Sequence, residues 1–342
     1  MKQGLVLSAL VGFVIVSAMT ALVIGSVPLS LETIARALIR AVTGIGGGDV
    51  PAAHQAIVVH LRLPRVLLAC LVGGTLALAG AVLQGLFRNP MADPGLIGVS
   101  SGGALGAVLA MVLGLASQSM WALPVLAFIG AGLATWVIFL LASSHGRTPL
   151  GMLLLAGLAV SAFLTAMTSL LLSLAKNIYV MREVLFWLMG GLEGRGWLHL
   201  WVAAVPALIA GGALSWFAQD LNVLAASGEE GARSLGLDMD RLKRWLLILT
   251  ALMVGAVVSV SGIIGFVGLI VPHIARLVVG PDHRILFPTV ALGGAVLLIW
   301  ADLLTRTLVP AQELRLGVVA AFVGAPFFIS LLRRHRAQSE AI

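Results

Sequence analysis

Charged residues are scarce in this sequence, and their shortage excludes a water-soluble protein. Only 10% of the 342 residues are charged, whereas 60% are hydrophobic, and the mean hydropathy is +1.09. Soluble domains carry about 25% charge, so these few polar groups could not cover a soluble fold of this size. The apolar runs are long and uninterrupted, unlike the short alternating strands of a membrane barrel. We therefore expect an all-α membrane protein.

Cysteine and lysine are rarer still. Cys70 is the only cysteine and lies in an apolar run, so no internal disulfide or cysteine-based metal site can form. We interpret it as a small buried hydrophobic residue. Lysine occurs at positions 2, 176 and 243 and never follows a glycine, so the phosphate-binding loop GxxxxGK[ST] is absent. No HExxH is present among the seven histidines. We expect no ATP hydrolysis, no metal and no bound cofactor in this chain.

The predicted helix interiors are nearly free of charge. A proton-coupled carrier usually needs carboxylates or histidines within the membrane. The clearest candidate is Asp302, four residues before Arg306, at a spacing that allows an ion pair on one helix face. It lies near the end of its helix rather than at the midplane. An energy source outside the chain is therefore the better hypothesis.

A single domain, residues 1–342, with about ten membrane-spanning helices is predicted, because each crossing needs about 20 mostly apolar residues. Pro64 suits a helix start, and the eighth span is expected to be short and broken by Pro272. An even count places both termini on one side, and the basic C-terminal tail and a charged loop predict that this side is cytoplasmic. The spans are residues 4–25, 63–86, 95–115, 121–142, 150–174, 197–218, 243–262, 264–279, 286–305 and 314–332.

The connections on the other side are less regular. Residues 26–62 contain a short amphipathic helix, Leu29–Ile39, followed by a GIGGGD turn. Residues 175–196 mix aromatic and charged side chains, which suits a helix lying at the outer surface. The net charge of +7 is spread over helix ends, so it indicates lipid headgroups rather than nucleic acid.

One stretch is charged far beyond the average. Residues 227–244 read SGEEGARSLGLDMDRLKR, in which eight of eighteen residues are charged. A short helical hairpin of this composition fits a groove on a soluble partner, although a merely solvated loop is the alternative.

Long, ordered blocks of this sequence resemble the permease subunits of the vitamin B12, ferric-siderophore and haem importer family of ABC transporters. Arg315 departs from that resemblance, since a proline is expected there. The blocks are LRLPRVLLACLVGGTLALAGAVLQGLFRNPMADPGLIGVSSGG at 61–103, FWLMGGLEGRGW at 186–197, GEEGARSLGL at 228–237, SGIIGFVGLIVPHIARLVVGPDHR at 261–284, ADLLTRT at 301–307 and QELRLGVVAAFVGAPFFISLLRR at 312–334.

The resemblance implies a machine with several partners. Two copies of such a permease form a homodimer in the bacterial inner membrane around one path. Two cytoplasmic ATPase subunits bind ATP and magnesium, and a periplasmic binding protein delivers the cargo. We expect an iron chelate, with haem slightly ahead of siderophores and cobalamin as the alternative. An ion-coupled carrier and an intramembrane enzyme are the alternatives from other classes.

The resemblance also assigns roles to residues. The ATPase-coupling loop, about residues 219–242, is centred on Gly228, Glu229, Glu230, Arg233, Ser234, Leu235 and Gly236. Docking of the binding protein is assigned to Arg62, Arg65 and Arg306, for which snorkelling to headgroups is the alternative. The path is assigned to Met152, Ser161, Phe163, Thr165, Met167, Thr168 and Ser169, of which any single one could be core filler. Side-chain chemistry, rather than the resemblance, suggests Tyr179 and Arg182, together with Lys176, Met181 and His199, as cargo contacts at the outer mouth, since tyrosine and histidine can ligate haem iron. An anchor at the membrane interface is the alternative for Tyr179.

Overall fold

Helices and the loops between them make up all that the computed structural model describes of this protein, namely residues 2–25, 27–44, 50–144, 147–309 and 314–339, and this part contains no β-strand. The elements are α1 (Lys2–Val23), α2 (Leu31–Thr43), α3 (Ala52–Ala56), the π-helix η1 (Ile57–Arg62), α4 (Leu63–Phe87), the 3₁₀ turn η2 (Pro94–Ile97), α5 (Val99–Val112), α6 (Leu115–Gln118), α7 (Ala122–Ala142), α8 (Leu150–Leu174), α9 (Ile178–Leu188), α10 (Trp197–Ser215), α11 (Ala218–Ser234), α12 (Met239–Ser261), α13 (Val267–Val279), α14 (His283–Thr307) and α15 (Leu316–Ser339).

Each predicted span corresponds to a helix, which confirms the all-α class. Within the described ranges, seven helical segments are long and apolar enough to cross a membrane: α1 from Gln3, the continuous segment Ala52–Phe87, α7, α8, α10, α12 and α14. Shorter apolar helices occupy the other three predicted spans, namely α5, α13 and the Leu316–Ser330 part of α15. The number of crossings therefore stays a prediction.

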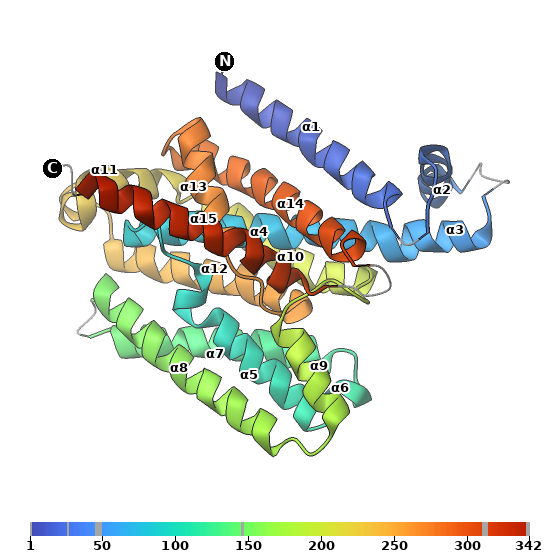
Figure 1. The fold of residues 1–342 in the computed structure, drawn as a ribbon. Coiled ribbons are helices and arrows are strands. Elements are labelled where there is room, and N and C mark those ends of the chain that lie inside the picture. Colours follow the sequence, from blue (N-terminus) through green and yellow to red (C-terminus); the bar gives the residue numbers. More distant parts are fainter. Residues whose placement is uncertain (1, 26, 45–49, 145–146, 310–313, 340–342) are drawn as a thin grey trace.

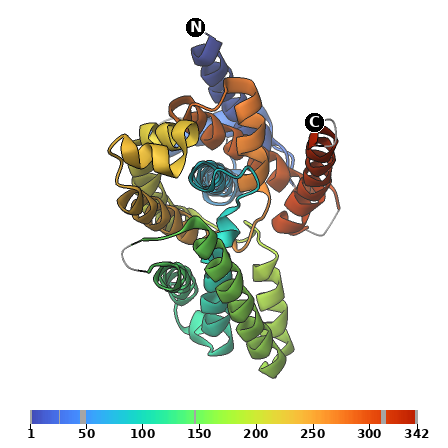
Figure 2. The ribbon, with the colours of Figure 1, turned by 90° about the vertical axis from the view of Figure 1, so that its left-hand side faces the viewer.

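Helix α4 lies at the centre of the bundle, and its neighbours surround it when the bundle is viewed along its length (Figure 2). Eighteen of its 25 residues are buried, and it packs against α1 and α10–α14. Small residues allow this packing, as their spacing predicts. A Cβ atom at Gly73 would collide with the carbonyl oxygen of Gly294 on α14, and one at Gly102 would collide with that of Gly130 between α5 and α7.

Of two predictions about proline, the one for Pro64 is confirmed and the one for Pro272 is wrong. Pro64 does lie in the first turn of α4, which begins at Leu63, but α4 continues an earlier helical segment that begins at Ala52 and includes the π-helical turn Ile57–Arg62. Such a turn shifts the hydrogen-bond register, so the helix can continue past a residue without an N–H group. Helix α13 likewise runs through Pro272, and the chain breaks earlier, at 262–266, where Phe266 adopts a left-handed φ of 68°.

The connections largely follow the predictions. The amphipathic helix is α2, which begins after Ser30, whose side chain accepts a hydrogen bond from Thr33 N at 3.1 Å. The expected outer helix is α9. Residues 45–49 of the glycine-rich turn and the side chains of the C-terminal arginines lie outside the described residues.

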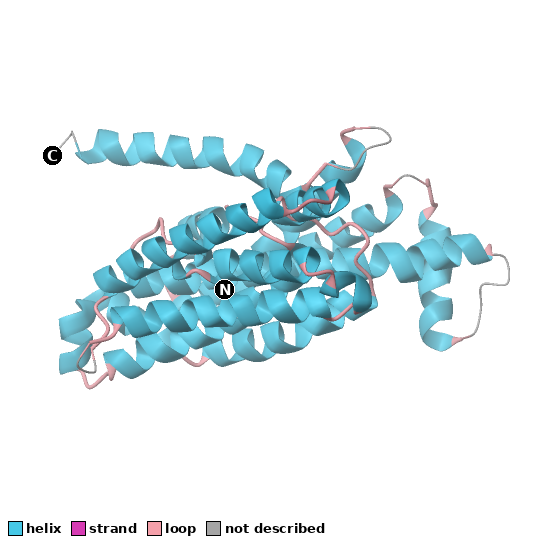
Figure 3. Cartoon of the chain, turned by 90° about the horizontal axis from the view of Figure 1, so that it is seen from below, coloured by secondary structure: helices cyan, strands magenta, loops and turns pink. Residues whose placement is uncertain are grey.

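Most helices lie roughly along one common axis, so the bundle has two ends (Figures 1 and 3). Helix α11 lies at one end together with the last turns of α15, and we call this the α11 end. Helices α2 and α3 lie at the opposite end, which we call the α2 end. Helix α1 finishes near α2 and begins toward the other end, so both chain ends point toward the α11 end.

Candidate functional site

The charged stretch forms a helical hairpin at the α11 end, as predicted. Helix α11 is interrupted at Gly228, whose φ of 74° and ψ of −178° suit glycine. The second half ends at Leu235, followed by Gly236 with φ 91°. There Leu237 N donates to Ala232 O at 3.0 Å, which closes the helix end. The hairpin thus has a fixed backbone at both of its turns.

Five residues close a ring of hydrogen bonds behind this hairpin, which we call the Lys243 ring. The Lys243 side chain, only 1% exposed, donates from Nζ to Glu229 Oε1 at 2.6 Å and to the backbone oxygen of Thr148 at 2.8 Å. Arg233 Nη2 donates to Glu229 Oε1 at 3.2 Å and to Asp240 Oδ2 at 2.7 Å. Thr148 N donates to Asp240 Oδ1 at 3.1 Å.

The Lys243 ring ties three elements together. Glu229 and Arg233 belong to α11, Asp240 and Lys243 begin α12, and Thr148 lies two residues before α8. The hydrogen bond to Asp240 raises the pKa of Arg233, so this guanidinium stays charged. A force on the hairpin is therefore carried directly to α12 and to the start of α8.

The ring changes which hairpin residues can meet a partner. Glu229 and Arg233, both assigned to the ATPase-coupling loop, make ion pairs inside the chain. Arg233 is itself 39% exposed. The exposed residues Glu230, Ser234, Leu235 (69% exposed) and Gly236 form what we call the Leu235 edge.

The residues assigned to a path divide between two faces of α8. Ser161, Thr165 and Thr168 line a cavity of about 290 Å³ between α5 and α8, with Ser100, Ser101 and Ser169 also in its lining. Ser101 Oγ donates to Ser161 Oγ at 3.2 Å. This hydroxyl cavity joins two stretches that the sequence singled out separately.

Met152, Phe163 and Met167 lie on the other face of α8. They are 48%, 64% and 38% exposed, respectively, and at about 100° per residue they lie roughly opposite to Ser161. The seven residues therefore do not form one mixed surface. Helix α8 has a hydroxyl face that lines the cavity, on which Thr168 is buried while Thr165 and Ser169 are exposed, and an apolar face roughly opposite to it.

The three arginines assigned to docking gather at the α2 end, but their side chains turn inward. Arg62 is 6% exposed and donates to the backbone oxygens of Leu22 at 2.6 Å, Val23 at 3.0 Å and Val27. Arg65 and Arg306 flank Asp302, which is 1% exposed, with ion-pair distances of 3.0 and 3.3 Å. The i, i+4 pair expected from the sequence is therefore present and has a second partner.

These arginines line one cavity of about 720 Å³, which we call the Arg62 cavity. Its wall also includes Glu193 and Arg195 from the connection between α9 and α10. The guanidinium groups of Arg62 and Arg65 are engaged within the chain, so in this conformation they anchor α1 and α14 to α4.

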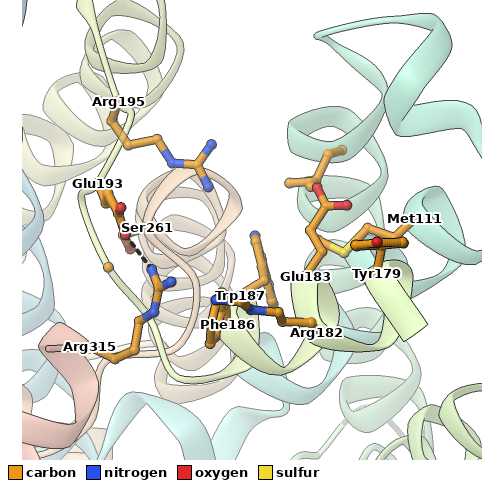
Figure 4. A pocket seen from close by; sticks show the side chains of 12 residues that line it. Met111, Tyr179, Arg182, Glu183, Phe186, Trp187, Glu193, Arg195, Ser261 and Arg315 are labelled. Atoms are coloured by element: carbon orange, nitrogen blue, oxygen red, sulfur yellow. Dashed lines mark hydrogen bonds and ion pairs between the residues drawn. The ribbon is translucent and has the colours of Figure 1, made fainter. Parts of the chain in front are cut away.

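A third cavity, of about 290 Å³, lies beside α9 and is lined by both predicted outer-mouth residues, Tyr179 and Arg182 (Figure 4). We call it the Phe186 cavity, because two guanidinium groups lie against that ring. The Arg182 Cζ atom is 5.0 Å and the Arg315 Cζ atom 3.8 Å from the ring centroid. Arg315 also pairs with Glu193 at 2.7 Å. The residue that departs from the resemblance thus completes this cavity.

The sequence did not predict the roles of Trp187 and Arg195 in this cavity. Arg195 Nη1 lies 3.3 Å from His199 Nε2, and burial lowers the pKa of Arg195 while nearby Glu183 opposes that shift. The Trp187 side chain is buried, and its Nε1 atom and the Nε atom of Arg195 lack hydrogen-bond partners within the described structure. Lys176, Met181 and His199, also suggested as cargo contacts, are not among the residues that line this cavity. The only available signal was the family-like block at 186–197.

Comparisons with known proteins agree with this architecture. The profile of the FecCD transport family matches residues 13–334. The chain is 48% identical over 285 residues to the cobalamin import system permease protein BtuC of Halobacterium salinarum, covering 83% of this chain and 75% of that protein. It is 44% identical over 285 residues to the hemin transport system permease protein HmuU of Yersinia pestis, covering 82% and 84%.

A solved structure has the same fold. It is described as an inward-facing conformation of a metal-chelate type ABC transporter and superposes with a TM-score of 0.84 at 33% sequence identity. The match covers 96% of this chain and 98% of that one.

Proposed function

The chain belongs to the FecCD transport family of ABC importer permeases, and on that premise we propose that it moves an iron chelate, either haem or a ferric siderophore, from the periplasm into the cytoplasm. Two copies form the path in the inner membrane, with both termini in the cytoplasm. Two ATPase subunits that bind ATP and magnesium drive the cycle, and a periplasmic binding protein supplies the cargo.

The α11 hairpin, braced by the Lys243 ring, supports the proposal that a separate ATPase drives transport. The chain has no phosphate-binding loop, so the energy must enter through a contact. The α11 hairpin is braced from behind by internal ion pairs and leaves the Leu235 edge exposed at the end of the bundle. A rigid element with one exposed apolar anchor, Leu235, suits a groove on a partner.

Ion-coupled transport is less well supported than ATP-driven transport. Asp302 was the clearest candidate for a proton-carrying carboxyl, but it is paired with both Arg65 and Arg306. A carboxylate held between two guanidinium groups has a structural role and is poorly suited to exchange protons.

Cobalamin is the second candidate cargo. The observation in its favour is the similarity to a cobalamin permease, which is slightly higher than the similarity to a hemin permease. The chain is similar to permeases named for both cargoes, so the fold alone does not choose between them.

Reconstitution tests this proposal. The chain, its ATPase and its binding protein are placed in vesicles, and entry of haemin, a ferric siderophore and cyanocobalamin is measured with and without ATP. We expect ATP-dependent uptake of an iron chelate that requires all three proteins. Uptake driven by an ion gradient without the ATPase would overturn the importer assignment, and uptake of cyanocobalamin alone would overturn only the cargo. The isolated chain should show no ATPase activity.

A further inference from the structure

The Phe186 cavity has a lining rich in hydrogen-bond donors. Three of its side chains are arginines, Arg182, Arg195 and Arg315, against two carboxylates, Glu183 and Glu193 (Figure 4). Within the described structure its two buried polar atoms without partners are both donors, Trp187 Nε1 and Arg195 Nε. An unpaired buried donor costs about 1–3 kcal/mol. A ligand that supplies acceptor oxygens would form the hydrogen bonds that these two donors do not make within the chain.

The two arginines beside Phe186 are positioned rather than free to move. The ring holds the guanidinium groups of Arg182 and Arg315 at 5.0 and 3.8 Å from its centre, and such stacking leaves the N–H groups at the edge of each guanidinium available. Helix α9 carries Arg182 and Phe186 four residues apart, on one helix face. Arg315 comes from the segment before α15, so the pair bridges two elements.

Glu193 occupies only part of the donor capacity of Arg315. A guanidinium has five N–H donors, and the ion pair uses Nη1 of Arg315. The Glu193 side chain is 50% exposed, and an exposed ion pair contributes only about 0–1 kcal/mol. An incoming carboxylate can therefore bind beside Glu193 or replace it at little cost.

We propose that the Phe186 cavity binds a carboxylate group of the cargo, held by Arg182 and Arg315. A cavity of about 290 Å³ takes a carboxylate-bearing arm rather than a whole chelate, and the bulk of the cargo lies outside it, toward Tyr179, which is 79% exposed. This inference rests on the proposed function. It favours haem over cobalamin as the cargo, because haem carries free propionates whereas the corrin side chains of cobalamin are amides.

Direct binding to the permease tests this site without the partner proteins. The full chain is purified in lipid nanodiscs, and the Kd of haemin is compared with that of its dimethyl ester, which lacks free carboxylates, using empty nanodiscs to subtract partition into lipid. We expect haemin to bind at least about tenfold more tightly than the ester, as loss of a charge-assisted pair predicts. Equal affinities would overturn the proposal.

Substitutions of Arg315 and Arg182 test whether these two residues are responsible for haemin binding. Arg315→Gln and Arg182→Gln should each weaken haemin binding by about tenfold and leave the ester unchanged, whereas Arg315→Lys should retain part of the affinity. Arg36→Gln is the matched control, since Arg36 is a half-exposed arginine of α2 at the same end, paired with Glu32. If Arg315→Gln does not fold, Arg182→Gln carries the test. Full haemin affinity in the folded variants would contradict the site.

The two proposals fail in different ways. If vesicles with the ATPase and binding protein import haemin and its ester equally well, the importer assignment stands and the carboxylate site is wrong. If haemin binds through Arg182 and Arg315 but no cargo enters with ATP, the site stands and the assignment as an ATP-driven importer is wrong.

Discussion

The charged side chains at the two ends of the bundle are arranged in opposite ways. At the α11 end the Lys243 ring closes on itself, and each of its charged groups has a partner within the chain. In the Phe186 cavity, on the side of α9 and the α9–α10 connection, arginines stack on an aromatic ring, and two buried donors lack partners in the described structure.

This difference indicates two functions. A closed network fixes the distance between α11, α12 and the start of α8, so it can transmit a force without binding anything itself. A cavity with unused donors has a favourable interaction still to make and can bind an anionic group. The same residue types therefore brace the α11 hairpin and leave the Phe186 cavity ready for a ligand.

Opening the ring should have the largest effect. Lys243→Met removes the buried ammonium group and leaves Thr148 O and Glu229 without it. We expect a loss of about 2–3 kcal/mol in the free energy of unfolding, below the cost for a fully buried pair because the Glu229 side chain keeps 33% exposure. ATP-driven uptake of every cargo should fall at least tenfold in the folded fraction. Arg241→Met, an exposed basic residue of the same helix, is the control and should do neither.

Arg62 tests whether an arginine at the α2 end can also have a structural role. Like the residues of the Lys243 ring, it makes its hydrogen bonds within the chain. Arg62→Met leaves three backbone oxygens of the α1–α2 connection without their donor, and we expect a loss of about 1–3 kcal/mol, measured by thermal unfolding in detergent. Affinity for the binding protein should be measured on the same variant. Unchanged stability with weakened docking would show that Arg62 faces the partner rather than anchoring α1.

The Leu235 edge should behave as a contact surface, with little effect on stability. Leu235→Asp changes a side chain that is 69% exposed, so the free energy of unfolding should stay within about 0.5 kcal/mol. Association with the ATPase should weaken about tenfold or more, as expected when an apolar anchor is replaced by a charge. Ala225→Asp, an exposed residue on the first half of α11, is the matched control. Equal ATPase affinity for Leu235→Asp and wild type would remove the hairpin from the interface.

The smallest effect is expected at Asp282, which links α11 to α14. Its carboxylate accepts from Arg284 N at 3.0 Å and from Asn222 Nδ2 at 2.7 Å, and these bonds lower the pKa of Asp282 below its ordinary value of 3.8. Its contribution to stability is present above pH 3.8 and is lost as the pH falls through the lowered pKa. Asp282→Asn keeps an N-cap, so unfolding at pH 7 should shift by less than about 0.5 kcal/mol.

Acid titration of the wild type and Asp282→Asn provides the check. The loss of stability below pH 4 should be smaller in the variant than in the wild type. Identical acid profiles for the two proteins would mean that this carboxylate contributes nothing through its charge.

Local features of the fold were predictable from the sequence. The boundaries 150–174 of α8 match the structure because a proline precedes a long apolar run, and the pair Asp302–Arg306 was readable because its partners are four residues apart.

The pairings within the sites were not predictable in this way. Thr148 and Lys243 are 95 positions apart, and Glu193 and Arg315 are 122 apart. Such contacts depend on how helices assemble, and no local period encodes them. Within the coupling loop the sequence likewise did not predict that Glu229 and Arg233 pair with Lys243 and Asp240.

ATP-driven uptake of haemin and of its dimethyl ester by Lys243→Met and Arg315→Gln, measured side by side, tests the contrast between the two ends most directly. The account predicts that Lys243→Met slows both cargoes alike, whereas Arg315→Gln slows haemin about tenfold and leaves the ester unchanged. Equal losses of both cargoes in both variants would contradict it, because the two ends would then have no separate roles.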